Sequence, residues 1–124
     1  MVLIIGGAYQ GKLDYVKENY PCKSLVQCSL EQTEMDLSGD IINSLHLIVL
    51  AQIRAGLDTL AYLREVYPKL KDKILICDDI FCGVVPVEKE TRIWRETMGR
   101  ALVFLSKNAD EVIRVFCGIG SRIK

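Results

Sequence analysis

The sequence lacks an excess of charge of either sign, and it lacks a long hydrophobic run. Its 16 Lys and Arg residues balance 16 Asp and Glu residues, so no overall field draws the chain to nucleic acid or to an anionic membrane. The most apolar segment, residues 45–53, contains His46 and Gln52 and is far shorter than the ~20 residues of a membrane span. We therefore expect neither a nucleic-acid nor a membrane partner, and we expect any anion site to be local.

Cysteine spacing typical of a metal site is also missing, and we expect no secretion. The five cysteines form no Cys-x-x-Cys pair and mostly lie within apolar runs, which predicts reduced, buried thiols instead of disulfides or a zinc site. The first apolar stretch, Val2 to Ile5, is too short for a secretory signal and is followed at once by glycines. The sequence therefore indicates a cytoplasmic protein.

Short apolar runs alternate with helix-like segments along a chain of 124 residues in which no linker or repeat intervenes. Strands are expected at residues 2–5, 24–28, 74–77 and 110–116, and helices at residues 12–20, 40–66 and 88–106. Gly56 is expected to split the middle helix, and a turn at residues 118–120 to close the last strand. The order βαβαβαβ predicts one α/β domain over residues 1–124, a three-layer sandwich with a mostly parallel sheet.

The sharpest motif follows the first predicted strand and fits the P-loop pattern G-x-x-x-x-G-K. It consists of Gly6, Gly7, Ala8, Tyr9, Gln10, Gly11 and Lys12. Glycines allow backbone N–H groups to surround phosphate oxygens, and the lysine ammonium neutralises the terminal phosphates. Leu13 stands where a Ser or Thr hydroxyl normally binds magnesium. The motif therefore predicts a phosphate-binding loop with weakened metal binding, against the alternative of a glycine turn shaped only for packing.

Other residues with chemical potential lie later in the chain. Asp78 and Asp79 end the 74–77 strand, where a carboxylate can hold magnesium or act in catalysis; capping of the next turn is the alternative. His46 shares an apolar stripe with helix residues, which favours a core histidine over a catalytic one. Arg92 and Arg95 are spaced i,i+3 and are suited to binding a phosphate, with solvated helix charges as the alternative.

Several blocks of the sequence resemble the adenosylcobinamide kinase/adenosylcobinamide-phosphate guanylyltransferase family. They are the 6–12 loop, Gly83-Val84-Val85-Pro86, Arg92-x-x-Arg95-x-x-x-Gly99-Arg100, Ala109-Asp110-Glu111-Val112 and Cys117-Gly118-Ile119-Gly120. The resemblance implies a RecA-like P-loop NTPase fold, ATP or GTP as nucleotide, magnesium, a corrinoid substrate and a homo-oligomer, namely a trimer. It also implies that Arg95 and Arg100 bind the nucleotide together with the loop residues through Leu13.

The departures from that family decide which activity is expected. The segment that carries the family's guanylyl-accepting histidine is not found, so we do not expect guanylyl transfer. The family's magnesium-binding aspartate strand is not evident either, unless residues 25–28 are its counterpart without the aspartate. Two hypotheses remain open: a cobinamide kinase-like phosphotransferase that uses Lys12, Asp78 and Asp79, and a non-catalytic nucleotide- or corrinoid-binding regulatory or assembly subunit.

Overall fold

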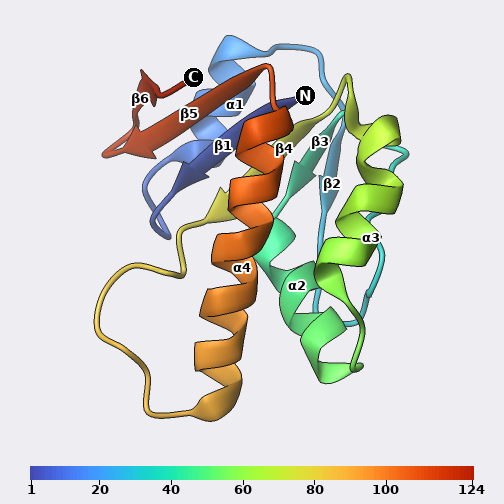
Figure 1. Cartoon of the computed structure of the whole chain (residues 1–124). Coiled ribbons are helices and arrows are strands. Elements are labelled where there is room, and N and C mark those ends of the chain that lie inside the picture. Colours follow the sequence, from blue (N-terminus) through green and yellow to red (C-terminus); the bar gives the residue numbers. More distant parts are fainter.

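A six-stranded sheet in the order β2-β3-β4-β1-β5-β6 forms the centre of the computed structural model, which describes residues 1–124 (Figure 1). The strands are β1 (Val2–Gly6), β2 (Leu25–Gln27), β3 (Ile41–Asn43), β4 (Ile74–Asp78), β5 (Glu111–Phe116) and β6 (Ile119–Arg122). The helices are α1 (Lys12–Asn19), α2 (Leu45–Arg54), α3 (Thr59–Val66), the 3-10 helix η1 (Tyr67–Leu70) and α4 (Lys89–Asn108). The first five strands are parallel, and β6 runs antiparallel to β5.

Alternate residues of the buried strands face two separate hydrophobic cores. Leu3 points to the larger core, which α2, α3 and α4 cover, whereas Ile4 points to a smaller core that α1 closes with Val16. A strand that is buried on both faces reads as a continuous apolar run, which is why the first strand was recognisable in the sequence. Helices on both faces of a mostly parallel sheet confirm the expected three-layer α/β arrangement.

The expected helix over 40–66 is wrong at its start. Ile41 and Ile42 belong to β3, and the chain then turns at Ser44, whose φ of 63° lies in the left-handed region, before α2 begins. The spacing of apolar residues misled the prediction because two adjacent isoleucines fit a buried strand as well as they fit a helical stripe. The predicted break is confirmed, since α2 ends at Arg54 and Asp58 caps α3 through the Ala61 N–H.

The prediction for the 110–120 segment is also incomplete, because β5 is not the last strand. Cys117 and Gly118 both adopt positive φ, 50° and 77°, and turn the chain directly back into β6.

The expectation of buried thiols holds for Cys28 and Cys77 but is wrong for the three other cysteines. Cys22, Cys82 and Cys117 are exposed because they lie in turns and loops.

The remaining elements follow the expectations closely. α1 ends just before the Tyr20-Pro21 pair, and α4 buries Met98, Ala101 and Leu105, with Trp94 only half-buried. No helix combines the length and apolar character needed to cross a membrane.

Candidate functional site

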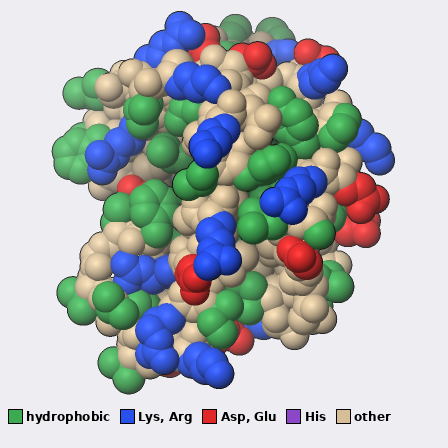
Figure 2. Space-filling model, viewed as in Figure 1, with side chains coloured by type: hydrophobic (Ala, Val, Ile, Leu, Met, Phe, Trp, Pro, Cys, Tyr) green, Lys and Arg blue, Asp and Glu red, His purple; other side chains and the backbone are tan.

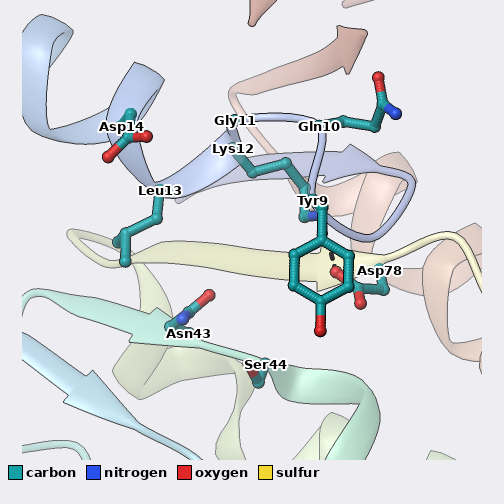
Figure 3. A pocket seen from close by; sticks show the side chains of 9 residues that line it. All are labelled: Tyr9, Gln10, Gly11, Lys12, Leu13, Asp14, Asn43, Ser44 and Asp78. Atoms are coloured by element: carbon teal, nitrogen blue, oxygen red, sulfur yellow. Dashed lines mark ion pairs between the residues drawn. The ribbon is translucent and has the colours of Figure 1, made fainter. Parts of the chain in front are cut away.

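A cavity of about 530 Å³ opens where β1, β3 and β4 end (Figure 3). These three strands are neighbours in the sheet and parallel, so their carboxyl ends meet at one edge, where ligands bind in open α/β sheets. The wall consists of Tyr9, Gln10, Gly11, Lys12, Leu13, Asp14, Asn43, Ser44 and Asp78. The second half of the predicted loop, the start of α1, the end of β3 and the end of β4 therefore share one cavity, whereas Gly6, Gly7 and Ala8 do not line it.

The loop between β1 and α1 leaves its backbone donors free. None of the N–H groups from Gly7 to Asp14 donates to an acceptor within the protein. The loop is folded and not extended, since Tyr9 and Gly11 adopt left-handed conformations with φ of 57° and 85°. Unpaired N–H groups at the start of a helix suit an anion, because the helix dipole adds a positive partial charge there.

The Lys12 ammonium is buried beneath this loop. The residue is only 7% exposed, and its Nζ lies 2.7 Å from Asp78 Oδ1 and donates to the Gly7 carbonyl at 2.6 Å. Figure 3 shows the side chain reaching from α1 across to the end of β4. A buried ammonium needs a partner, and in this structure Asp78 fills that position.

His46, at the start of α2, holds Asp78 from the other side. Its Nδ1 accepts the Asp78 backbone N–H at 3.2 Å, so the ring proton belongs on Nε2, which lies 3.7 Å from Asp78 Oδ2. Burial lowers the pKa of His46, and the Lys12 charge lowers it further, while the Asp78 carboxylate raises it. The imidazole is therefore neutral at pH 7. The Trp94 indole N–H donates to the His46 carbonyl at 2.8 Å and ties α2 to α4.

Asn43 and Ser44 complete the cavity, and the sequence analysis missed both of them. The Ser44 hydroxyl makes no capping bond to α2, and the Asn43 and Ser44 side chains add uncharged polar groups to the cavity. Both residues were hidden by the predicted helix; an Asn-Ser pair directly after two isoleucines was the available signal of a strand end. Left-handed non-glycine residues cost about 1–3 kcal/mol and gather at functional sites. Of the four in this chain, Tyr9 and Ser44 line the cavity.

The oxygen donors of the cavity fit a magnesium ion that arrives with phosphates. Asp78 offers a carboxylate, and Asn43 and Ser44 offer neutral oxygens, which match the preference of magnesium for a few oxygen ligands plus phosphates and water. No group of three or more His, Cys, Asp or Glu residues is arranged to hold a metal without other ligands. Asp79 does not line the cavity; its N–H donates to the Gly6 carbonyl at 3.1 Å.

The structure does not bring Arg95 or Arg100 to this cavity. Arg95 donates to the carbonyls of Phe81, Gly83 and Val84, at 2.7, 3.2 and 2.6 Å. Arg100 forms an exposed pair with Glu96 one turn earlier on α4, at 2.6 Å.

Arg92 is used in the same way as Arg95, since it donates to the carbonyls of Pro86 and Val87. The two arginines spaced i,i+3 thus hold the 79–88 loop, which connects β4 to α4. Neither of them lines the cavity beside the loop between β1 and α1.

Comparison with known families agrees with the resemblance seen in the sequence. The model of a family described as "Cobinamide kinase / cobinamide phosphate guanyltransferase" matches residues 26–123, which is most of the chain. The matched range starts after α1, so the 6–12 loop lies outside it and its interpretation depends on the geometry given above. No curated protein matches the sequence.

Proposed function

This chain belongs to the cobinamide kinase / cobinamide phosphate guanyltransferase family, and from that premise we propose that it binds ATP or GTP and phosphorylates a cobinamide hydroxyl. The reaction would be a cytoplasmic step of cobalamin biosynthesis. The proposal treats the molecule as a P-loop protein of the RecA-like type, with the phosphates held by residues 6–12. The nucleotide and the corrinoid are its two proposed small-molecule partners.

One observation carries the proposal: a row of free backbone donors lies over a buried ammonium. The N–H groups of residues 7–14 have no acceptor in the protein, and the Lys12 Nζ is within reach of the same cavity. A triphosphate would supply acceptors for these donors and negative charge for the ammonium. A glycine turn shaped only for packing would not require these donors to face a cavity that also holds Lys12.

Phosphate binding requires Lys12 to exchange partners. The ammonium that now contacts Asp78 Oδ1 would turn to the terminal phosphate, which releases the Asp78 carboxylate towards the cavity. The cobinamide hydroxyl oxygen would then attack the γ-phosphorus while the bond to the leaving nucleoside diphosphate breaks, and Asp78 would accept the hydroxyl proton. A magnesium ion would neutralise phosphate charge, and Asn43, Ser44 and the Asp78 oxygen that does not take the proton would hold it.

Guanylyl transfer is not part of the proposal. Both nitrogens of His46 face Asp78, one accepting its N–H and the other lying 3.7 Å from its carboxylate. The residue is 8% exposed and does not line the cavity, so neither nitrogen is presented to a nucleotide phosphorus.

The second candidate is a non-catalytic nucleotide- or corrinoid-binding subunit with a regulatory or assembly role. The Leu13 side chain favours it, because an aliphatic group stands where a hydroxyl would complete the magnesium shell. Asp79 lies outside the cavity, and so only Asp78 of the predicted pair remains there.

For either candidate we propose a homo-oligomer, namely a trimer. The exposed apolar side chains of Phe116, Ile119 and Ile123 offer a face for contact between copies.

Calorimetric titration of ATP and GTP, with and without magnesium, tests the binding step. We expect Lys12→Ala to weaken binding about 10- to 100-fold even without metal, since a charge-assisted bond is lost. Leu13→Ser should increase the magnesium dependence, which we expect to be small in the wild type. Lys17→Ala, an exposed lysine on the same helix, is the matched control and should bind as the wild type does.

Formation of phosphorylated cobinamide from ATP or GTP separates the two candidates. Product that requires Lys12 and Asp78 supports the kinase. Nucleotide binding without product supports the non-catalytic subunit, and a wild type that binds neither nucleotide overturns both.

A further inference from the structure

The turn between β5 and β6 lies directly against the loop between β1 and α1. The Cys117 N–H donates to the side-chain Oε1 of Gln10 at 2.8 Å, and the Gly118 N–H donates to the Gln10 main-chain carbonyl, also at 2.8 Å. Gln10 is thus bonded twice to the same two-residue turn. Cys117 adopts a left-handed conformation with φ of 50°, which an ordinary residue keeps only where its surroundings impose it.

The two segments also approach each other closely on either side of Gln10. A Cβ at Gly6 would come within 2.3 Å of the Val115 carbonyl oxygen, and a Cβ at Gly11 within 3.1 Å of the Gly118 Cα. Glycine is required at both positions for this approach. The loop therefore lies along the end of β5 and its turn from Gly6 to Gly11.

The direction of the hydrogen bonds is what makes this contact useful. The hairpin contributes donors and the loop contributes acceptors, namely the carbonyl and the amide oxygen of Gln10. The loop is consequently held in its folded form without using any N–H group between Gly7 and Asp14. A contact of the opposite polarity would have occupied the groups that an anion needs.

We propose that Gln10 is a positioning residue, and that its bonds to the Cys117–Gly118 turn hold the loop in its phosphate-binding form before a ligand arrives. The inference rests on the proposed function, because it concerns the same phosphate site. Gln10 acts through the loop backbone and not by contact with the reacting atoms. A loop that is already ordered loses less freedom on binding, and so it binds more tightly.

Titration with pyrophosphate in the absence of metal tests this role. Gln10→Met keeps the length of the side chain and removes the acceptor, and we expect it to weaken pyrophosphate binding about five- to tenfold. Gln10→Asn is too short to reach the turn and should behave in the same way. The matched control is Gln32→Met, at an exposed glutamine that makes no side-chain hydrogen bond, which should change the affinity less than about twofold.

The amide resonance of Cys117 provides a readout that a general loss of stability would not move. In both Gln10 variants this resonance should shift, because its acceptor is lost, while the resonances of α4 stay in place. Pyrophosphate affinity equal to the wild type in both variants, or an unshifted Cys117 amide, would overturn the inference alone. A wild type that does not bind pyrophosphate would overturn the proposed function together with it.

Discussion

Two loops in this molecule follow a central parallel strand and lead into a helix, yet they present opposite backbone groups. The loop after β1 offers free N–H groups, whereas the loop after β4 offers carbonyls, and Arg92 and Arg95 donate to five of these. The first keeps a lysine buried; the second exposes Val84 and Val87 at more than 90%. Figure 2 shows such hydrophobic side chains beside basic ones at the lower left, over this second loop.

The comparison shows that a positive side chain near a strand end does not by itself indicate a phosphate site. Arginine has five donors and no acceptor, and backbone carbonyls that lie within reach can occupy these donors. In the second loop the chain supplies its own acceptors to Arg95. In the first loop the acceptors are missing, and an anion can supply them.

Substituting Gly6, the last residue of β1 before the first loop, and Gly83, in the second loop, tests how closely other atoms surround each segment. Gly6→Ala should give the largest loss of stability of all the changes considered. Gly6→Ala places a Cβ 2.3 Å from the Val115 carbonyl, and we expect a loss of about 3 kcal/mol in the free energy of unfolding. Gly83→Ala meets no atom within 4 Å, and its positive φ costs only about 1 kcal/mol. Chemical denaturation of both variants provides the measurement. Equal losses would show that the two loops are packed alike.

Removing the α4 arginine that donates to the second loop should give an intermediate effect that stays local. In Arg95→Gln the carbonyls of Phe81, Gly83 and Val84 lose their donor, so amide hydrogen exchange of the 79–88 loop should become about tenfold faster. Pyrophosphate affinity should change less than about twofold, because Arg95 does not line the cavity.

Arg100→Gln is the control for this measurement, since its exposed pair with Glu96 contributes little to stability. If pyrophosphate affinity in Arg95→Gln fell as far as in Lys12→Ala, the arginine would belong to the phosphate site, as the sequence resemblance implies.

A change of pH should give the smallest effect of the three, and it should act through His46, whose side chain lies beside Asp78 and Lys12. The pKa of His46 is lowered by burial, so the folded protein holds this group neutral, while the unfolded chain takes up a proton near the ordinary value of 6.5. Stability is therefore complete above pH 6.5 and declines as the pH falls towards the lowered value. Hydrogen exchange between pH 7 and pH 5 should show weaker protection of the Asp78 amide, which donates to His46, because the bonds from the α4 arginines to the second loop do not titrate in this range.

His46→Gln should remove that pH dependence. Three aspartates do not contribute to it, because hydrogen bonds lower their pKa values below the ordinary 3.8 and they change stability only at pH values below the range from 7 to 5. They are Asp36, Asp40 and Asp110. A wild type whose stability stayed constant from pH 7 to pH 5 would contradict the assignment of a buried neutral imidazole.

Much of the fold followed from apolar runs and from residues that stop helices. β1 and β4 are buried on both faces and are visible as continuous apolar runs, and Pro21 marks the end of α1. β3 was not recognisable because it has only three residues and continues into the apolar stripe of α2. Its short length left no period from which a strand could be inferred.

The site residues that lie within one segment were predictable from the sequence. The contacts between segments that are far apart in the sequence were not. The loop residues and Asp78 were identified from their position beside buried strands, and the structure places residues 9–13 and Asp78 in one cavity, whereas Gly6, Gly7 and Ala8 do not line it. The pairing of Lys12 with Asp78 and the contact of Gln10 with Cys117 depend on which strands are neighbours. Sequence spacing does not contain that information, and the expectation that Arg95 and Arg100 lie near the phosphates came from the family resemblance.

The bond between Gln10 and Cys117 joins residues that are 107 positions apart, and this separation affects the order of events during synthesis. The loop and its lysine leave the ribosome long before the hairpin that supports them, and contacts of such long range form late in folding. If the loop binds nucleotide as proposed, a nascent chain that ends before β5 would carry the whole loop and yet bind nucleotide weakly. Nucleotide affinity would then report that β5 and β6 have joined the sheet, and would distinguish finished molecules from unfinished ones.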